Sequence, residues 1–202
     1  MPLELPLPII YAITSGTSTA KTTSESPEFS SILQLVEAAV AAELPLVQLR
    51  EKSLSARVLY ELTTRAVALT RDSKTRLLVN DRFDVARAAG ADGVQLTTRS
   101  LAASVVRQLC GEDFLIGVSV HSLETALEAR AEGADFVVFG PVFETESKRA
   151  FGPPQGLEKL REVATALQGF PVVAIGGINL ENVLECFSVG ASGMAAIRLF
   201  NE

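Results

Sequence analysis

The sequence predicts an α/β fold, a single minimal (β/α)8 TIM barrel, from three observations. Eight short apolar runs recur along the chain, and segments with helical spacing lie between them. Such runs are typical of parallel strands that are buried on both faces, because helices cover the sheet. The 202 residues are enough for one such barrel with few insertions, so we expect one domain over residues 1–202.

The expected strands are short and mostly apolar, and they occupy residues 9–13, 46–50, 77–80, 93–96, 115–119, 136–140, 172–176 and 194–197. Seven segments rich in Ala, Leu, Glu and Arg separate them as expected helices, at residues 32–42, 56–70, 84–89, 101–109, 123–131, 157–167 and 180–187. Side chains that can cap a helix precede four of these helices, at Ser55, Ser100, Ser122 and Asn179. Glycines that suit the left-handed end of a helix precede three strands, at Gly90, Gly133 and Gly190.

Two features depart from the regular alternation. Residues 14–27 are rich in Ser and Thr and form a long loop after the first strand, either a mobile segment or a lid. If the eighth strand ends near Phe200, only Asn201 and Glu202 follow it, so the last helix is expected to be short or missing. A doubly wound open sheet, which is also built from βαβ units, is the alternative architecture.

Composition excludes several classes of function. The formal charge is −6 and no basic run is present, which argues against a nucleic-acid partner. Two distant cysteines and one histidine exclude a disulfide scaffold, a thiolate zinc cluster and a multi-histidine metal site. No segment has the roughly 18 apolar residues of a membrane span, and residues 1–10 do not resemble a secretory signal. We expect a cytoplasmic protein with no membrane partner, and a homo-oligomer is left open.

Polar residues follow the apolar runs at the strand ends where such barrels perform chemistry. Gln48, Arg50 and Lys52 alternate on one face of the second strand. Since the segment is otherwise apolar, a binding site is favoured over a solvated edge. Asn80 and Asp81 end the third strand, where capping of the next helix is the alternative role.

Later strand ends add further candidates. Ser119 and His121 share a face at the end of the fifth strand, although for His121 alone a hydrogen-bonded structural role is favoured. Gly176 and Gly177 form either a tight turn or a close backbone approach to a phosphate. Residues 145–149, which include Thr145 and Ser147, are either a solvated loop or a phosphate lid.

Cations gather at the strand ends of this net-acidic chain, at Arg50, Lys52, Lys148 and Arg198. This pattern predicts an anionic small ligand. Asp81 is a candidate Mg²⁺ ligand, because Mg²⁺ often combines one or two carboxylates with phosphate oxygens and water. Cations, a carboxylate and hydroxyls together describe a diphosphate site, whereas no Ser-His-Asp or Cys-His arrangement can be assembled.

Several phrases carry a family resemblance, in order from the second strand to the seventh. They are residues 48–52 (QLREK), 79–82 (VNDR), 91–96 (ADGVQL), 117–122 (GVSVHS) and 140–145 (GPVFET), then Lys148 and residues 173–178 (VAIGGI). Together they resemble the thiamine-phosphate synthase/TenI family, whose fold is a (β/α)8 barrel. The resemblance covers nearly the whole chain.

The resemblance implies a transferase that joins hydroxymethylpyrimidine diphosphate to hydroxyethylthiazole phosphate and releases pyrophosphate with the help of Mg²⁺. The family pattern assigns the pyrimidine diphosphate to Gln48, Arg50, Lys52, Asn80, Ser119 and Lys148. Of these we class Arg50, Lys52, Ser119 and Lys148 as catalytic, because they stabilise the leaving group. Asp81 would bind Mg²⁺, and the thiazole phosphate side would be lined by Thr145, Ser147 and Gly177.

Three positions depart from the family pattern. Ser100 stands where synthases carry a second Mg²⁺-binding carboxylate, and Arg198 replaces a small hydroxyl residue at the phosphate end. In the TenI branch, a thiazole tautomerase has a catalytic histidine where this chain has Pro141. The synthase is the favoured interpretation. The alternatives are a TenI-like tautomerase, which would need His121 or a carboxylate for proton transfer, and a non-catalytic regulator of the thiamine pathway.

Overall fold

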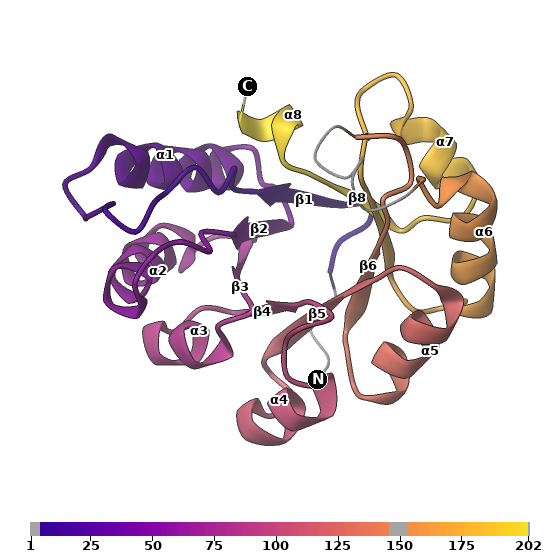
Figure 1. Cartoon of the computed structure of the whole chain (residues 1–202), viewed down its shortest axis with the longest axis horizontal. Helices are drawn as coiled ribbons and strands as arrows, with labels where there is room; N and C mark the ends of the chain where they lie inside the picture. The colour runs from indigo at the N-terminus through magenta and orange to yellow at the C-terminus, as the bar shows by residue number, and fades with distance from the viewer. Residues whose placement is uncertain (1–4, 146–152, 202) are drawn as a thin grey trace.

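Eight parallel strands close into a barrel with helices around its outside (Figure 1). The computed structural model describes residues 5–145 and 153–201. Neighbours in the sequence pair in order from β1 to β8, and β1 also pairs with β8 in parallel. The barrel prediction is therefore confirmed, and the alternative of an open doubly wound sheet is wrong.

The strands are β1 (Ile9–Ile13), β2 (Leu46–Leu49), β3 (Arg76–Asn80), β4 (Gly93–Leu96), β5 (Leu115–Val120), β6 (Phe136–Phe139), β7 (Val172–Ile175) and β8 (Gly193–Ala196). The helices are α1 (Pro27–Ala41), α2 (Ala56–Thr70), α3 (Phe83–Ala89), α4 (Ala103–Cys110), α5 (Leu123–Ala131), α6 (Gly156–Ala166), α7 (Val183–Ser188) and α8 (Arg198–Asn201). All eight expected strands and all seven expected helices are present, with shifted ends in several places.

Two of the four expected helix caps are confirmed. Ser55 accepts a hydrogen bond from the Val58 N–H, and Ser122 forms a capping box with Thr125. Ser100 does not cap a helix, because α4 begins only after Ala102. Asn179 likewise lies ahead of α7, and its Oδ1 accepts the backbone N–H groups of residues 181 and 182 in the preceding turn.

The start of α1 and the end of the chain differ from expectation. The first helix begins at Pro27 rather than residue 32, because proline suits the first helical position and Phe29 is already buried. Strand β8 ends at Ala196 rather than near residue 200, and Arg198 is the first residue of the four-residue helix α8. A last helix is therefore present and short, which was one of the two expected outcomes.

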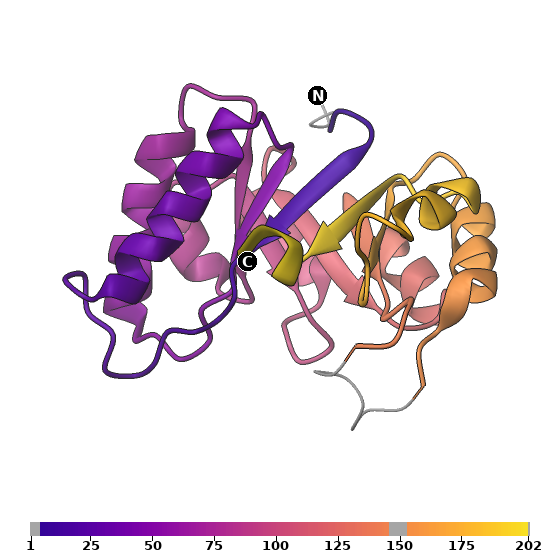
Figure 2. The ribbon, with the colours of Figure 1, turned by 90° about the horizontal axis from the view of Figure 1, so that it is seen from above.

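Helix α8 packs on the seam where β8 meets β1. Phe200 contacts both outer hydrophobic clusters, one under α1 to α4 and the other under α5 to α7. The Asn201 amide donates to the Ile13 carbonyl oxygen at 2.9 Å. These contacts turn the chain back across the seam at residue 197, and Figure 2 shows α8 beside the ends of β1 and β8.

The barrel interior is filled by side chains. Ile9, Leu78, Leu115 and Val173 belong to this cluster and are almost fully buried. The Tyr11 ring meets the Phe136 ring edge to face, with centroids 5.9 Å apart. The lumen is thus a packed core beneath any ligand.

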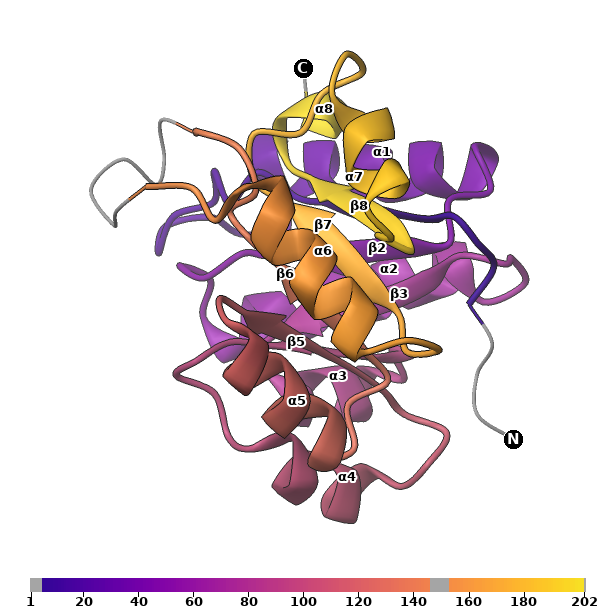
Figure 3. The ribbon, with the colours of Figure 1, turned by 90° about the vertical axis from the view of Figure 1, so that its right-hand side faces the viewer.

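A repeated device fixes the amino ends of three strands. The side chains of Asp92, Asp135 and Ser192 each accept the backbone N–H of a residue on the preceding strand. The glycine two residues before each of them has a positive φ, as expected for the ends of α3, α5 and α7. Figure 3 views the barrel from the side of α5, α6 and α7, the helices that lie between β5 and β8 in the chain. No helix in the described part of the chain is long and apolar enough to span a membrane.

Candidate functional site

The carboxyl ends of the eight parallel strands meet at one rim of the barrel, and the polar residues expected from the sequence lie there. Just inside this rim the apolar lumen gives way to a polar layer. Gln48 and Gln95 are almost fully buried, whereas Asn80 and Ser119 are partly exposed. A polar layer above an apolar core is the arrangement expected of a ligand-binding floor.

Two hydrogen-bonded groups make up the layer. The Gln48 amide donates to Asn80 Oδ1 at 3.2 Å. Tyr11 donates its hydroxyl to Gln95 Oε1 at 3.3 Å, and Gln95 Nε2 donates to Ser119 Oγ at 3.1 Å. Gly117 leaves room for this chain, since a Cβ there would collide with Gln95 Oε1 and with the Phe136 ring.

The direction of these bonds sets what the layer can offer a ligand. Burial raises the pKa of Tyr11 well above its usual value of 10.0, so its hydroxyl remains protonated and donates. Since Ser119 Oγ accepts from Gln95, its own O–H is left to donate elsewhere. The Asn80 Nδ2 group is likewise left as a donor. The layer therefore presents neutral donors toward the rim.

Arg50 and Lys52 follow β2, which ends at Leu49. Strand alternation therefore extends to Gln48 and ends at Leu49, and the chain turns before Lys52. The Arg50 side chain is partly buried and Lys52 is exposed. The Arg50 N–H donates to Thr14 Oγ1 at 2.8 Å, which joins β2 to the long loop after β1.

Asp81 stands at the end of β3 with a φ of 65°, in the left-handed region that is uncommon outside glycine. Its N–H donates to the Gln95 carbonyl oxygen at 2.9 Å. The alternative role as a helix cap is wrong, because residue 82 holds the N-cap position of α3. Within the described residues, no hydrogen bond or ion pair engages the Asp81 carboxylate. A strained residue with a free carboxylate at the rim is a candidate ligand for a cation.

The fit to Mg²⁺ rests on Asp81 and on the ligand. Glu51 is occupied by the loop after β1, and Asp84 pairs with Arg82 at 2.6 Å. Ser100 Oγ accepts from the Thr97 N–H at 2.8 Å and closes its own turn. The described residues contain no group of three acidic, histidine or cysteine side chains that could hold a metal. One carboxylate fits Mg²⁺ where diphosphate oxygens and water complete the shell.

His121 follows β5 and is tied to the end of β6. Its Nδ1 lies 2.5 Å from the Gly140 carbonyl oxygen, so Nδ1 carries the proton that is donated. In the neutral ring, Nε2 is then an acceptor. The structure is therefore compatible with both interpretations of His121. It joins two strand ends as a structural residue, and it is exposed at the rim, where a ligand can reach it.

The Gly176-Gly177 turn packs against the segment after β6. Both residues have positive φ, 99° and 67°. A Cβ on Gly176 would lie 2.5 Å from Pro141 Cβ, and one on Gly177 would lie 2.5 Å from the Glu144 carbonyl oxygen. The turn is therefore tight, as the first of the two hypotheses expects. The Gly177 N–H has no acceptor among the described residues, so the same geometry is also compatible with a close backbone approach to a phosphate.

The remaining expected site residues are divided between the described and undescribed parts of the chain. Thr145 is partly buried just beyond β6, and Arg198 is exposed at the start of α8, above β8. Ser147 and Lys148 lie outside the described residues, as does most of the expected phosphate lid.

Tyr11, Gln95 and Glu51 are site residues that the sequence argument did not single out. A signal for Gln95 was present, since a buried polar residue two positions after Gly93 faces the lumen. Tyr11 belongs to an apolar run and looked like core. Glu51 stands between two cations in the sequence, yet it is only 3% exposed.

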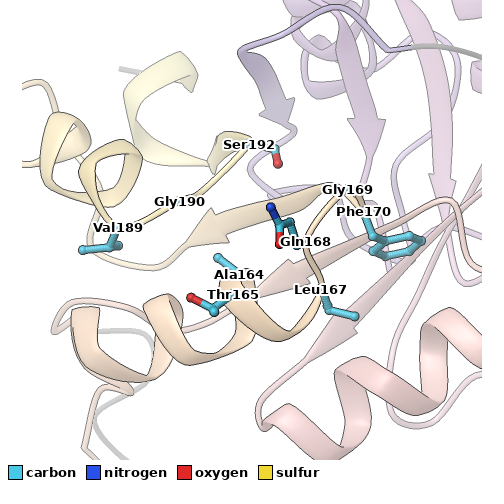
Figure 4. Close-up of a pocket in the computed structure, with 9 residues that line it drawn as sticks. All are labelled: Ala164, Thr165, Leu167, Gln168, Gly169, Phe170, Val189, Gly190 and Ser192. Carbon is cyan, nitrogen blue, oxygen red and sulfur yellow. The ribbon is translucent and has the colours of Figure 1, made fainter.

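A pocket of about 390 Å³ lies at the opposite end of the barrel, between the end of α6 and the loop before β8 (Figure 4). Its lining includes Thr165, Gln168, Phe170 and Ser192, and none of the lining residues carries a charge. An anionic ligand has no charged partner there, so the rim remains the candidate site.

Comparison with known proteins gives consistent similarities. A family model described as thiamine monophosphate synthase matches residues 11–200. The thiamine-phosphate synthase of Chlorobium phaeovibrioides is 47% identical over 152 residues, 75% of this chain and 72% of that protein. That of Moorella thermoacetica is 42% identical over 165 residues, 82% of this chain and 78% of that protein. The solved thiamine phosphate pyrophosphorylase of Pyrococcus furiosus has a TM-score of 0.76 at 37% identity, over 93% of this chain and 84% of that one.

Proposed function

Because the chain belongs to the thiamine monophosphate synthase family, we propose that it joins hydroxymethylpyrimidine diphosphate to hydroxyethylthiazole phosphate and releases pyrophosphate. The observation that carries this proposal is the polar layer of Gln48, Asn80, Gln95 and Ser119 with Arg50 beside it at the rim. Neutral donors suit the nitrogen atoms of a heteroaromatic ring, and a cation suits its diphosphate.

The reaction requires little proton transfer. The bond between the pyrimidine methylene carbon and the diphosphate oxygen breaks, and the electron pair leaves with pyrophosphate. The carbocation that remains is captured by the thiazole nitrogen, which forms the new C–N bond. Catalysis then consists of stabilising the charge that develops on the leaving group, a task for fixed cations and hydrogen-bond donors.

Different residues at the rim bind the diphosphate and the pyrimidine of the first substrate. Arg50 and Lys52 neutralise the diphosphate, and the Ser119 O–H donates to it. Asn80 and Gln48 orient the pyrimidine. Lys148 is assigned to the same diphosphate by the family pattern.

Asp81 would hold Mg²⁺ together with diphosphate oxygens and water. When bound, Mg²⁺ withdraws charge from the leaving diphosphate and so favours its departure. The strained backbone of Asp81 supports this role, as does its carboxylate, which forms no hydrogen bond or ion pair with a described residue. Ser100 does not take part, because its hydroxyl is used within its own turn.

The thiazole phosphate is assigned to the side of β6, β7 and β8. The Gly177 N–H and the Thr145 hydroxyl are donors there, and Ser147 follows Thr145 by two residues in the sequence. Arg198 adds a cation at the start of α8. His121 follows β5, and so it lies between the strand ends assigned to the two substrates. Its Nδ1 is bonded to the Gly140 carbonyl oxygen, so Nε2 is the acceptor that remains for a ligand.

A TenI-like tautomerase is less well supported. Pro141 has no side-chain proton to transfer, and His121 is held by the Gly140 carbonyl oxygen. The cytoplasmic location and a homo-oligomer remain predictions from the sequence.

Binding of the first substrate tests the proposal separately from turnover. Calorimetric titration with hydroxymethylpyrimidine diphosphate in the presence of Mg²⁺ should give saturable binding. Arg50→Ala should weaken it by about tenfold or more, since a charge-assisted hydrogen bond is lost. Arg71→Ala, an exposed arginine at the far end of α2, is the matched control and should leave it unchanged. Equal affinity of wild type and Arg50→Ala would overturn the assignment.

A further inference from the structure

Glu51 is a buried acid between two cations of the rim. Its side chain is 3% exposed, and it points into the loop that follows β1. Glu51 Oε1 accepts the Thr14 hydroxyl at 2.6 Å and the Gly16 N–H at 3.2 Å, and Oε2 accepts the Ser18 N–H at 3.3 Å. Burial of a carboxylate is costly unless hydrogen bonds replace its water. Here those bonds all come from one short stretch of loop.

The same stretch of loop touches Arg50 at two places. Thr14 Oγ1 donates to Glu51 and accepts the Arg50 N–H at 2.8 Å, so one hydroxyl links the two residues. Gly16, at a φ of +74°, lies against Arg50: a Cβ there would be 3.1 Å from the Arg50 carbonyl oxygen and 3.3 Å from Nη1. The loop therefore contacts both the main chain and the guanidinium of Arg50.

We propose that Glu51 is a positioning residue, which fixes residues 14–18 as a wall and through that wall holds Arg50 in its binding orientation. This inference rests on the proposed diphosphate site. The first part of the long loop is then a fixed support rather than a lid. A cation whose geometry is already set loses less conformational freedom when the ligand binds, so affinity is gained without a direct contact.

Thr14→Val tests the link with the smallest change. Valine has nearly the shape of threonine but cannot join Glu51 to the Arg50 N–H. We expect the Kd for inorganic pyrophosphate, measured by calorimetry in Mg²⁺ buffer, to rise about tenfold. Thr14→Ser keeps a hydroxyl and should retain most of the affinity. Glu51→Gln should weaken binding in the same direction.

Thr22→Val is the matched control. Thr22 is also a buried threonine of this loop, but its hydroxyl accepts the Thr19 N–H at 2.9 Å and is bonded neither to Glu51 nor to Arg50. It should leave the pyrophosphate Kd within about twofold of wild type. Thermal unfolding of each variant verifies that the barrel is intact. A wild-type Kd for a folded Thr14→Val protein would overturn the inference.

A double-mutant cycle separates positioning from general stabilisation. If Thr14 acts through Arg50, then Thr14→Val in an Arg50→Ala background should change the pyrophosphate Kd by less than about twofold. The same fold-change in both backgrounds would overturn the inference, because the loop would then act independently of Arg50. Failure of the proposed function gives a different result, in which Arg50→Ala itself binds pyrophosphate as tightly as wild type.

Discussion

The Gln95 amide nitrogen lies 3.1 Å from the Ser119 hydroxyl oxygen, across neighbouring strands β4 and β5. Because Tyr11 donates to the other end of the same amide, the Gln95 side chain is held in one orientation. That orientation leaves the Ser119 O–H free to donate. The buried Gln95 side chain thereby sets the donor pattern at the rim.

Tyr11→Phe should weaken this arrangement. The change removes the donor to Gln95 Oε1 in a buried site, so we expect the free energy of unfolding in urea to fall by about 1 kcal/mol. We also expect weaker binding of the pyrimidine substrate, because Gln95 is then free to rotate. Tyr60→Phe is the control, since Tyr60 is 45% exposed. Equal effects of the two changes would contradict the role given to the Tyr11 hydroxyl.

Asp81→Gly should separate stability from activity. Glycine adopts a positive φ without strain, so we expect the free energy of unfolding to rise by roughly 0.5 kcal/mol. Mg²⁺-dependent turnover should fall by about a hundredfold or more, because the metal carboxylate is lost.

Glu43→Gly is the control for Asp81→Gly, since Glu43 is an exposed residue with a φ of 50°. The Glu43→Gly change should also raise the free energy of unfolding, although loss of the exposed pair with Lys74 offsets a small part of the gain. This variant should keep full activity. Retained Mg²⁺-dependent turnover in Asp81→Gly would remove Asp81 from the metal site.

The Arg107–Asp135 pair should give a pH-dependent contribution to stability. Burial raises the pKa of Asp135 above 3.8, and hydrogen bonds from the Ile116 N–H and Arg107 oppose that rise. The folded state then binds a proton more tightly than the unfolded state. Stability contributed by this group therefore falls as the pH rises from 3.8 through the folded pKa.

Arg107→Leu removes a group that keeps Asp135 ionised, and the pair is largely buried, with 12% and 25% of the side chains exposed. We expect a loss of about 2–3 kcal/mol at neutral pH. The loss should be smaller at about pH 4.5, where Asp135 takes up a proton more readily. Arg76→Leu, in a more exposed pair with Asp92, should cost less. Urea unfolding at both pH values measures this, and an equal loss at both would contradict the account.

Gly176→Ala should disturb the rim by collision as well as by strain. A Cβ at this position would meet Pro141 Cβ at 2.5 Å, and the φ of 99° is unfavourable for alanine. Gly169→Ala isolates the second effect, because Gly169 has a φ of +81° and nothing within 4 Å of its added Cβ. We expect a loss of about 1–2 kcal/mol for Gly169→Ala and more for Gly176→Ala. Similar losses in urea unfolding would mean that the turn can move away from Pro141.

The sequence predicted the barrel because each buried parallel strand is a separate apolar run with a clear gap on either side. The exception was the end of β8. Leu199 and Phe200 continue the apolar character of Met194–Ile197, so the run alone could not show that the chain turns at residue 197. Only the seam between β8 and β1, which Phe200 fills, explains the turn.

At the candidate site, strand ends were predictable but directions after them were not. Alternation applies along β2 and stops at Leu49, so it covers Gln48 but does not extend to Lys52. Glu51 was missed because its burial depends on a loop more than thirty residues earlier in the chain. The positive φ of Asp81 leaves no mark in the sequence either, since aspartate at a strand end is equally typical of a helix cap.

Formation of thiamine phosphate tests the central claim most directly. The purified protein is incubated with hydroxymethylpyrimidine diphosphate, hydroxyethylthiazole phosphate and Mg²⁺, and the product is measured by fluorescence after oxidation. The account predicts product with the wild-type protein, none after chelation of Mg²⁺, and little with Arg50→Ala. No product from a folded wild-type protein that binds both substrates would contradict the proposed synthase.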